Sequence, residues 1–183
     1  NALTTTADLC ATVADLHQLD YDSSLYGRSF LPLLTGEVEQ TREYVLYGYF
    51  GGQLSYCDGT YSFHKQPGTP NAPLQLYTTR LTTHPSKTPA LQELFRVSDE
   101  KEIDAFLKDT DYPVIKVAVP ADAQLSWCAD EYMPDTAFDL YADPEQERPL
   151  RDPGLLERLR QEMITAMSRE RFPPEQFERL RLV

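Results

Sequence analysis

Apolar residues near the start of the chain recur at the spacing of a helix. Leu9, Val13 and Leu16 stand at positions i, i+4 and i+7, which predicts a helix over residues 4–17 with one apolar stripe. A polar loop and a short apolar segment at residues 30–34 come next. The stripe predicts that this helix lies against another surface.

The pattern then changes to that of β-strands. Three stretches rich in aromatic and β-branched residues, 44–50, 53–57 and 60–64, predict an antiparallel meander. Asp58-Gly59, between the second and third stretches, is a strong hairpin signal, because a type I′ turn needs positive φ at both central residues. A small antiparallel sheet is therefore expected here.

The stretch beyond the meander is less regular. Three further segments have the composition of strands: 74–79, 112–119 and 136–141. Between them, residues 99–107 predict a helix capped by Ser98 or Asp99, which are residues of the kind that accept the first free amides of a helix.

Helical signals return at the end of the chain. Asp152 is a good N-cap and Pro153 is pre-organised for the first helical position, so a helix is predicted from Pro153 to about Met167. A short final helix should begin at Pro173-Pro174. Together these elements predict the α+β class, with an antiparallel sheet of about four strands packed against a C-terminal helix.

Composition and charge exclude some classes of function. The net charge is −12, from 17 basic and 29 acidic residues, and such a surface repels nucleic-acid phosphates. The sequence holds no apolar run of about 18 residues, so no membrane span is expected. Cys10, Cys57 and Cys128 form no C-x-x-C pair and are expected to be buried free thiols rather than zinc ligands or a disulfide framework. The chain is expected to be soluble, and its compartment stays unknown.

No complete catalytic or metal motif is present. The sequence lacks G-x-S-x-G, G-x-G-x-x-G, a P-loop and H-E-x-x-H. The three histidines fit no metal-ligand spacing and are interpreted as surface or strand residues: His17, His64 and His84. Two acidic pairs lack the regular donors of a calcium loop: Asp20/Asp22 and Asp109/Asp111. No catalytic or metal-binding residue is therefore assigned to this chain.

Four segments of the sequence, taken in their order along the chain, match sequence patterns of one known protein family. Residues 6–16 read T-x-D-L-x-x-T-x-x-D-L, and residues 27–36 end in P-L-L-T-G. Residues 56–61 contain the D-G hairpin, and residues 138–150 read F-D-L-Y-x-D-P-x-Q-E-x-P-L. These segments resemble the C-terminal part of sulfatases, in the alkaline phosphatase superfamily. Two departures are Cys10-Ala11, where a small apolar residue and proline are usual, and Pro149, where asparagine is usual.

The resemblance implies a division of labour. In sulfatases a formylglycine nucleophile and a Ca²⁺ ion act on the sulfate ester, and both belong to the larger α/β domain. The resemblance therefore implies that calcium and formylglycine lie in a missing N-terminal part, which is the expected partner of this chain. Residues 1–36 would be terminal elements of the large domain and residues 37–183 the C-terminal subdomain, with an unmatched insertion at about 66–135.

The glycine turn after the first predicted strand is a candidate for the edge of the substrate cleft. Two glycines permit close backbone approach, and aromatic faces suit a sugar or aryl group. A plain structural turn explains the same residues equally well. A basic cluster further along could instead line a pocket for an anion, although surface charges are the simpler interpretation. The substrate-binding candidates are Tyr49, Phe50, Gly51, Gly52, Arg80 and His84.

Three functions stay open at this point. The first is the C-terminal portion of a sulfatase, which supplies structure and one wall of the cleft for a sulfate-ester substrate but no catalytic residue. The second is the same part of a related phosphodiesterase or phosphonate hydrolase. The third is a stand-alone binding module without enzymatic activity, whose N-terminal helix would fold back on its own sheet. The identity of the parent enzyme is therefore uncertain, and this chain alone is not expected to catalyse a reaction.

Overall fold

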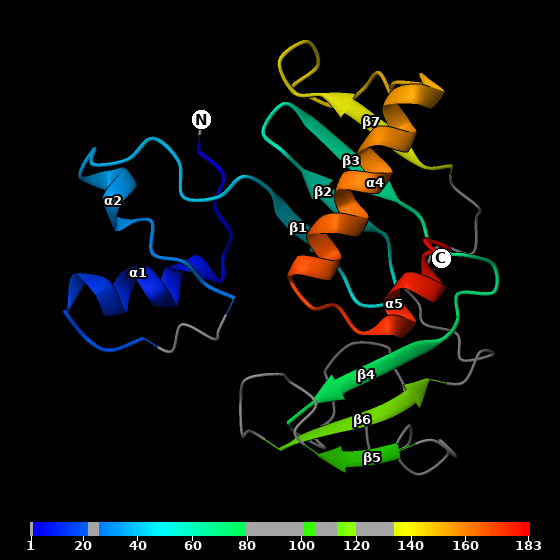
Figure 1. Cartoon of the computed structure of the whole chain (residues 1–183), viewed down its shortest axis with the longest axis horizontal. Coiled ribbons are helices and arrows are strands. Elements are labelled where there is room, and N and C mark those ends of the chain that lie inside the picture. The colour runs from blue at the N-terminus through cyan, green and yellow to red at the C-terminus, as the bar shows by residue number, and fades with distance from the viewer. Residues whose placement is uncertain (1, 22–25, 80–100, 105–112, 120–133) are drawn as a thin grey trace. The chain divides into compact units, whose positions relative to one another are not determined.

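A computed structural model describes most of the 183-residue chain (Figure 1). The described residues are 2–21, 26–79, 101–104, 113–119 and 134–183. The chain divides into two compact units. The first comprises 1–47, 55–64 and 136–159, and the second comprises 48–54, 65–135 and 160–183. The predicted division at residue 36 stays a prediction.

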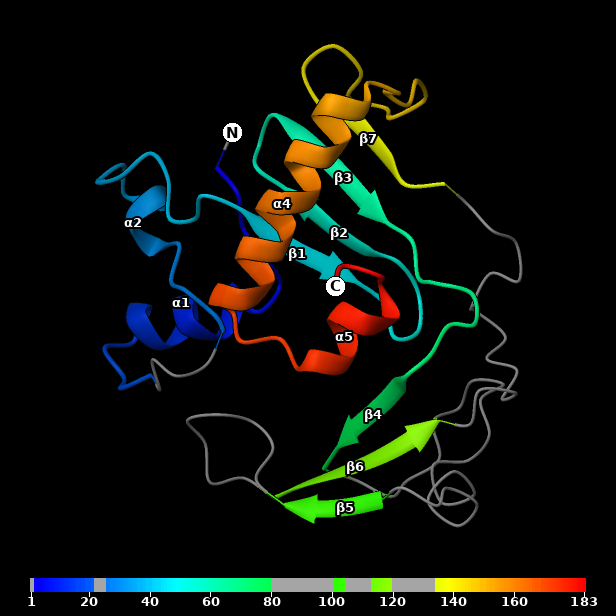
Figure 2. The same ribbon diagram turned by 45° about the vertical axis from the view of Figure 1, so that its right-hand side comes forward.

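A four-stranded sheet contains the predicted meander. Its strands are β1 (Val45–Gly48), β2 (Leu54–Cys57), β3 (Tyr61–Lys65) and β7 (Thr136–Asp139), in the order β1-β2-β3-β7. Figure 2 shows the four strands side by side. Strand β7 is antiparallel to β3, with Ala137 opposite Phe63, and both of these residues are buried. The predicted α+β class with a small antiparallel sheet and a C-terminal helix is confirmed.

The hairpin between β2 and β3 turns one residue later than predicted. The amide of Asp58 donates to the carbonyl of Tyr61, so the central residues are Gly59 and Thr60. Gly59 has φ +89°, whereas Asp58 is not in the positive-φ region, so the predicted type I′ turn over Asp58-Gly59 is wrong. The Asp58 carboxylate instead accepts the amides of Thr60 and Tyr61, each at 2.7 Å. Glycine at the first central position is the requirement of a type II′ turn.

The N-terminal helix is shorter than predicted. Helix α1 spans Asp8–Leu16, and α2 spans Leu31–Leu34 within the predicted apolar segment. The apolar stripe of α1 faces solvent, with Leu9, Val13 and Leu16 exposed by 54%, 54% and 61%. The buried residues of α1 are Asp8, Ala11 and Thr12.

The second unit contains a three-stranded antiparallel sheet. Its strands are β4 (Leu74–Thr78), β5 (Lys101–Asp104) and β6 (Val114–Val119), in the order β4-β6-β5. Strands β4 and β6 confirm two of the predicted strands. The helix predicted over residues 99–107 is wrong where the structure describes it, because residues 101–104 form β5. Pairing along the β-branched strand β6 outweighs a local helix propensity of about a few tenths of a kcal/mol per residue.

The C-terminal helices confirm the sequence signals that predicted them. Helix α4 spans Pro153–Arg169 and α5 spans Pro174–Arg179. The Asp152 carboxylate accepts the amides of Gly154 and Leu155 at 2.8 and 3.2 Å, as an N-cap does. The predicted apolar face of α4 includes three side chains with no exposed surface: Leu159, Met163 and Met167. None of the helices in the described part of the chain is long and apolar enough to cross a bilayer.

Candidate functional site

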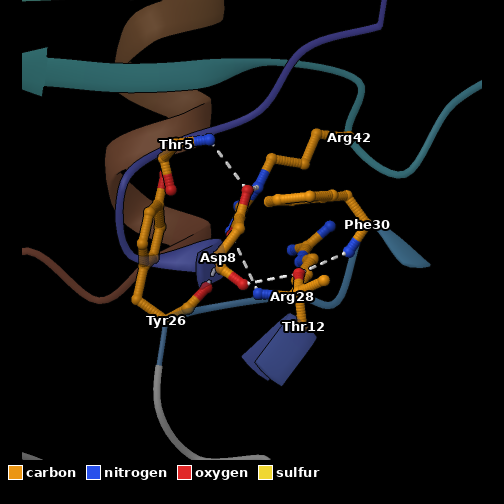
Figure 3. Close-up of polar contacts among 7 residues, drawn as sticks. All are labelled: Thr5, Asp8, Thr12, Tyr26, Arg28, Phe30 and Arg42. Atoms are coloured by element: carbon orange, nitrogen blue, oxygen red, sulfur yellow. Dashed lines mark hydrogen bonds and ion pairs between the residues drawn. The ribbon is translucent and has the colours of Figure 1, made fainter. Parts of the chain in front are cut away.

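A buried ion pair joins Asp8, the first residue of helix α1, to Arg42 (Figure 3). The Asp8 and Arg42 side chains are 0% and 1% exposed. Arg42 Nε donates to one oxygen of the Asp8 carboxylate at 3.0 Å, and Arg42 Nη2 donates to the other. This bidentate geometry orients both charges and gives the strong form of a carboxylate–guanidinium pair.

Backbone amides complete the surroundings of the Asp8 carboxylate. The amides of Thr5 and Arg28 each donate to it at 2.8 Å. Thr12, one turn further along α1, donates from Oγ1 to the Asp8 carbonyl at 2.8 Å and accepts the Phe30 amide at 3.0 Å. Two polar residues of α1 therefore attach the helix to the segment around residues 28–30.

Arg42 has further contacts on its other side. Its Nη2 donates to the Tyr26 carbonyl at 2.8 Å, and its Cζ lies 4.5 Å from the centroid of the Tyr26 ring. A guanidinium over an aromatic face gains electrostatic attraction, which is larger when water is excluded. The charge of Arg42 is thus compensated by a carboxylate, a carbonyl and a ring.

The protonation of Asp8 follows from these contacts. Burial alone raises the pKa of Asp8, but hydrogen bonds from the Arg42 side chain and from the Arg28 and Thr5 amides favour the carboxylate, and the net effect lowers the pKa. A general base must reach a substrate and titrate near the working pH. Asp8 meets neither requirement, so the geometry assigns it to stability rather than to proton transfer.

The predicted turn at residues 49–52 lies in the second unit. The Gly52 amide donates to the Tyr49 carbonyl at 3.0 Å, which closes the turn. Tyr49 is 52% exposed, whereas Phe50 is partly buried and packs against the cluster of Leu74 and Val119. Of the two aromatic rings, Tyr49 is the one that presents substantial surface to solvent.

Both glycines of the turn are buried and have structural reasons to be glycine. Gly51 has φ +73°, a conformation that side chains rarely adopt. A Cβ on Gly52 would lie 2.2 Å from carbon atoms of the Tyr49 ring. The close approach that Gly52 permits is made by the protein's own Tyr49 ring. Whether a ligand also contacts this turn stays a prediction.

The other two predicted ligand residues, Arg80 and His84, lie outside the residues that the structure describes. The structure therefore brings together Tyr49, Phe50, Gly51 and Gly52 but does not test whether the basic cluster is near them.

A polar cluster on the four-stranded sheet was not predicted. Ser55 Oγ lies 2.8 Å from His64 Nδ1, and His64 Nε2 lies 3.2 Å from Gln146 Oε1. Ser62 Oγ donates to Gln146 Oε1 at 2.7 Å. The alternation of Ser62 and His64 along β3 indicates one shared face, but Gln146 is 82 residues away from His64 in sequence and has no local signal.

This cluster resembles a serine–histidine pair but lacks an accessible nucleophile. Ser55 is 1% exposed, so its hydroxyl does not meet solvent. The ring of Tyr47 packs edge-on against His64. Burial and the nearby Cys57 raise the pKa of Tyr47, whereas a hydrogen bond with Ser55 opposes the rise. The expected interpretation of His64 as a strand residue agrees with its position in β3.

The cysteines follow the prediction only in part. Cys57 is buried, and burial raises the pKa of its thiol, so it stays protonated. Cys10 is exposed, which corrects the expectation that the thiols are buried. Helix α1 places Cys10 beside Leu9 on the solvent side, away from the buried positions 8, 11 and 12. Cys128 lies outside the described residues. Among the residues described, no group of three acidic, cysteine or histidine side chains could hold a metal ion.

Comparisons with known proteins do not assign this chain to a family. No family model matches the chain, and no curated protein matches it. A solved structure of a sulfatase ("6S-sulf") of Bacteroides thetaiotaomicron, described with the metabolism of multiple glycosaminoglycans, is similar at a TM-score of 0.43 and 14% identity. The match covers 88% of this chain and 24% of that one, so this chain spans about a quarter of the neighbour's length. A likeness at that level assigns neither fold nor function.

Proposed function

We propose that this chain is the C-terminal portion of a sulfatase, which supplies structure and one wall of the substrate cleft. The support is the ordered set of sequence segments at 6–16, 27–36, 56–61 and 138–150. The described structure contributes an observation of its own, which is the orientation of helix α1.

Helix α1 has its apolar side outward, and this observation carries the proposal. A surface helix of a globular protein normally turns its apolar stripe towards the core. Here Leu9, Val13 and Leu16 are each more than half exposed, while the inward side holds Asp8 and Thr12. Burial of a Leu or Val side chain is worth about 1.5–3 kcal/mol, so three of them left in water are costly unless another surface covers them. An N-terminal α/β domain of the same polypeptide is the occupant we propose.

The catalytic groups of the proposed enzyme are assigned to that other domain. A formylglycine nucleophile would come from a C/S-x-P-x-R motif. None of the three cysteines is followed by that pattern, since the sequence reads Cys10-Ala11-Thr12, Cys57-Asp58-Gly59 and Cys128-Ala129-Asp130. Among the described residues, no cluster with the donor set for a calcium ion is found. It is the resemblance to sulfatases that implies calcium and formylglycine in the rest of the proposed enzyme, and no residue of this chain is given a role in holding either of them.

The first test reads the coding sequence upstream of Asn1. A preceding α/β region with C/S-x-P-x-R supports the sulfatase, whereas a Thr or Ser nucleophile without that motif indicates the related phosphodiesterase or phosphonate hydrolase. A gene that begins at or near Asn1 and encodes no partner would overturn both and leave the binding module.

The second test measures activity of the longest natural polypeptide. Hydrolysis of 4-nitrophenyl sulfate is compared with hydrolysis of 4-nitrophenyl phosphate and bis(4-nitrophenyl) phosphate at equal concentrations. We expect the sulfate ester to be the preferred substrate, with activity lost on calcium chelation. A preference for either phosphate ester would contradict the proposal even if the upstream domain is present.

A further inference from the structure

Two side chains from other segments form hydrogen bonds to the backbone of the turn that carries Tyr49. Arg179 of helix α5 donates from Nη1 to the Gly52 carbonyl at 3.0 Å. Asn71 donates from Nδ2 to the Gly51 carbonyl at 2.6 Å. Arg179 Nη1 also lies 3.1 Å from Asn71 Oδ1, so the two side chains are joined to each other. Two successive carbonyls of the turn are thus fixed by one connected pair.

Arg179 is itself oriented by its surroundings. Only 4% of its surface is exposed, and its Nε donates to Gln176 Oε1 at 3.1 Å, within the same helix. The carbonyl of Arg179 accepts the Gly68 amide at 2.7 Å. A buried guanidinium with several fixed partners has few alternative rotamers, so the position of α5 is transmitted to the turn.

The turn has reason to need this support. Gly51 is in a positive-φ conformation, and glycine has access to many other conformations. A backbone hydrogen bond from the Gly52 amide to the Tyr49 carbonyl spans the turn. Holding a contact residue in its bound conformation before the ligand arrives reduces the entropy lost on binding. The exposed ring of Tyr49 is the group that would benefit, because an aromatic face can stack on an aryl group or a sugar ring.

We propose that Arg179 and Asn71 are positioning residues that hold the Tyr49–Gly52 turn in the conformation that meets the aryl or sugar ring of the substrate. This inference rests on the proposed function, because the turn contacts a substrate only if this chain forms a wall of the cleft. Neither residue touches the substrate itself. Their effect acts through the backbone of Gly51 and Gly52 on the ring of Tyr49.

The structural half is tested by amide hydrogen exchange in the longest natural polypeptide. Arg179→Met keeps a long side chain without its donors, and Asn71→Ala is the second variant, which guards against misfolding of the first. We expect the Gly52 amide to exchange at least about tenfold faster in either variant, because the fixed turn opens more often. Arg179→Lys should recover part of the protection, because an ammonium group can reach one acceptor but does not reproduce the fork of a guanidinium.

Tyr77→Phe is the matched control. The Tyr77 hydroxyl is hydrogen-bonded to Glu175 at the start of α5, so this variant removes another attachment of the same helix and leaves Arg179 in place. Exchange at Gly52 should stay within about twofold of the wild type. Equal acceleration in Tyr77→Phe and Arg179→Met would show that general loosening of α5 is responsible, and unchanged exchange in both positioning variants would overturn the inference directly.

The functional half of the inference is tested by measuring KM and kcat separately with 4-nitrophenyl sulfate. We expect Asn71→Ala and Arg179→Met to raise KM about five- to twentyfold with kcat within about twofold, because the chemistry lies elsewhere and the loss is one of binding. Wild-type KM values in variants whose turn exchanges faster would overturn the inference and leave the proposed function intact. A wild-type polypeptide that hydrolyses no sulfate ester would instead refute the proposed function, and with it the role of the turn.

Discussion

Replacement of Asp8 by asparagine should be among the most damaging single changes in the chain. The substitution keeps the shape of the side chain but removes the negative charge that faces Arg42. The asparagine NH2 group cannot accept the hydrogen bonds that one carboxylate oxygen now receives. A guanidinium charge is left in a site that solvent does not reach.

The expected loss of unfolding free energy follows from the burial of Asp8 and from the number of hydrogen bonds that its carboxylate accepts. Breaking a buried ion pair by removing one partner costs about 3–5 kcal/mol, because the remaining charge is neither solvated nor paired. Asp8 is 0% exposed and also accepts the Thr5 and Arg28 amides, so we expect about 3–5 kcal/mol for Asp8→Asn. Domains are stable by about 5–15 kcal/mol in total, so this loss would be a large fraction of the stability of the domain.

The loss of stability caused by Asp8→Asn should also depend on pH. The pKa of Asp8 is lowered in the folded protein, so its contribution is present above the ordinary carboxyl pKa of 3.8 and is lost as the pH falls through the folded value. The difference in stability between wild type and Asp8→Asn should therefore be largest near neutral pH and shrink below about pH 4. A difference that grew on acidification would contradict this sign.

Urea titration of wild type and variants at several pH values measures these quantities. Asp15→Asn is the matched control, since Asp15 lies in the same helix and its carboxylate is exposed, where it accepts a hydrogen bond from the Ser29 hydroxyl at 2.6 Å. We expect the control to cost less than about 1 kcal/mol. A double-mutant cycle with Arg42→Met should show strong coupling, because the second change removes the orphaned charge. An Asp8→Asn cost below about 1 kcal/mol, or strict additivity with Arg42→Met, would refute the reasoning.

Three further substitutions, the last of them with a matched control, test other parts of the fold. Asp152→Ala removes the cap of α4 and should cost about 0.5–2 kcal/mol by urea titration; no change would contradict the capping role. Leu159→Ala, at a side chain with no exposed surface, should cost about 2–5 kcal/mol, and a cost below about 1 kcal/mol would argue against a packed core there. Gly52→Ala should displace the Tyr49 ring in a crystal structure of the variant, whereas Gly36→Ala, with open space around its Cβ and φ +76°, should show only a backbone penalty of about 1 kcal/mol.

Local chemical signals in the sequence predicted the elements that depend on few neighbours. The start of α4 follows from Asp152-Pro153, because both residues act on the first turn that they adjoin. Strand β6 follows from its β-branched residues. The hairpin was placed but its centre was wrong by one residue, since the Asp58 carboxylate accepts two amides of the turn and Gly59 takes the first central position.

Sequence patterns did not predict the contacts between segments that lie far apart in the chain. Arg42 is 34 residues from Asp8, and no local pattern in the sequence indicated that it is only 2% exposed. Residues 101–104 have a helical composition, but their register opposite β6 makes them a strand. The link from Arg179 to Gly52 joins residues 127 positions apart. The candidate turn at residues 49–52 was found by its glycines, whereas the side chains that hold it were not.

The outward stripe and the buried ion pair of α1 depend on each other. A nine-residue helix is only marginally stable alone, and its inward side offers little apolar surface, only Ala11 between two polar residues. The helix is therefore held by Asp8 and Thr12, and this attachment is what keeps Leu9 and its stripe in a fixed orientation. Release of the ion pair should also release whatever the stripe binds. In the longer polypeptide that we propose, Asp8→Asn should then cost more by urea titration than in this chain alone, because apolar burial is lost together with the polar anchor. Equal costs in the two would mean that the stripe is not covered, and the proposed domain contact would be wrong.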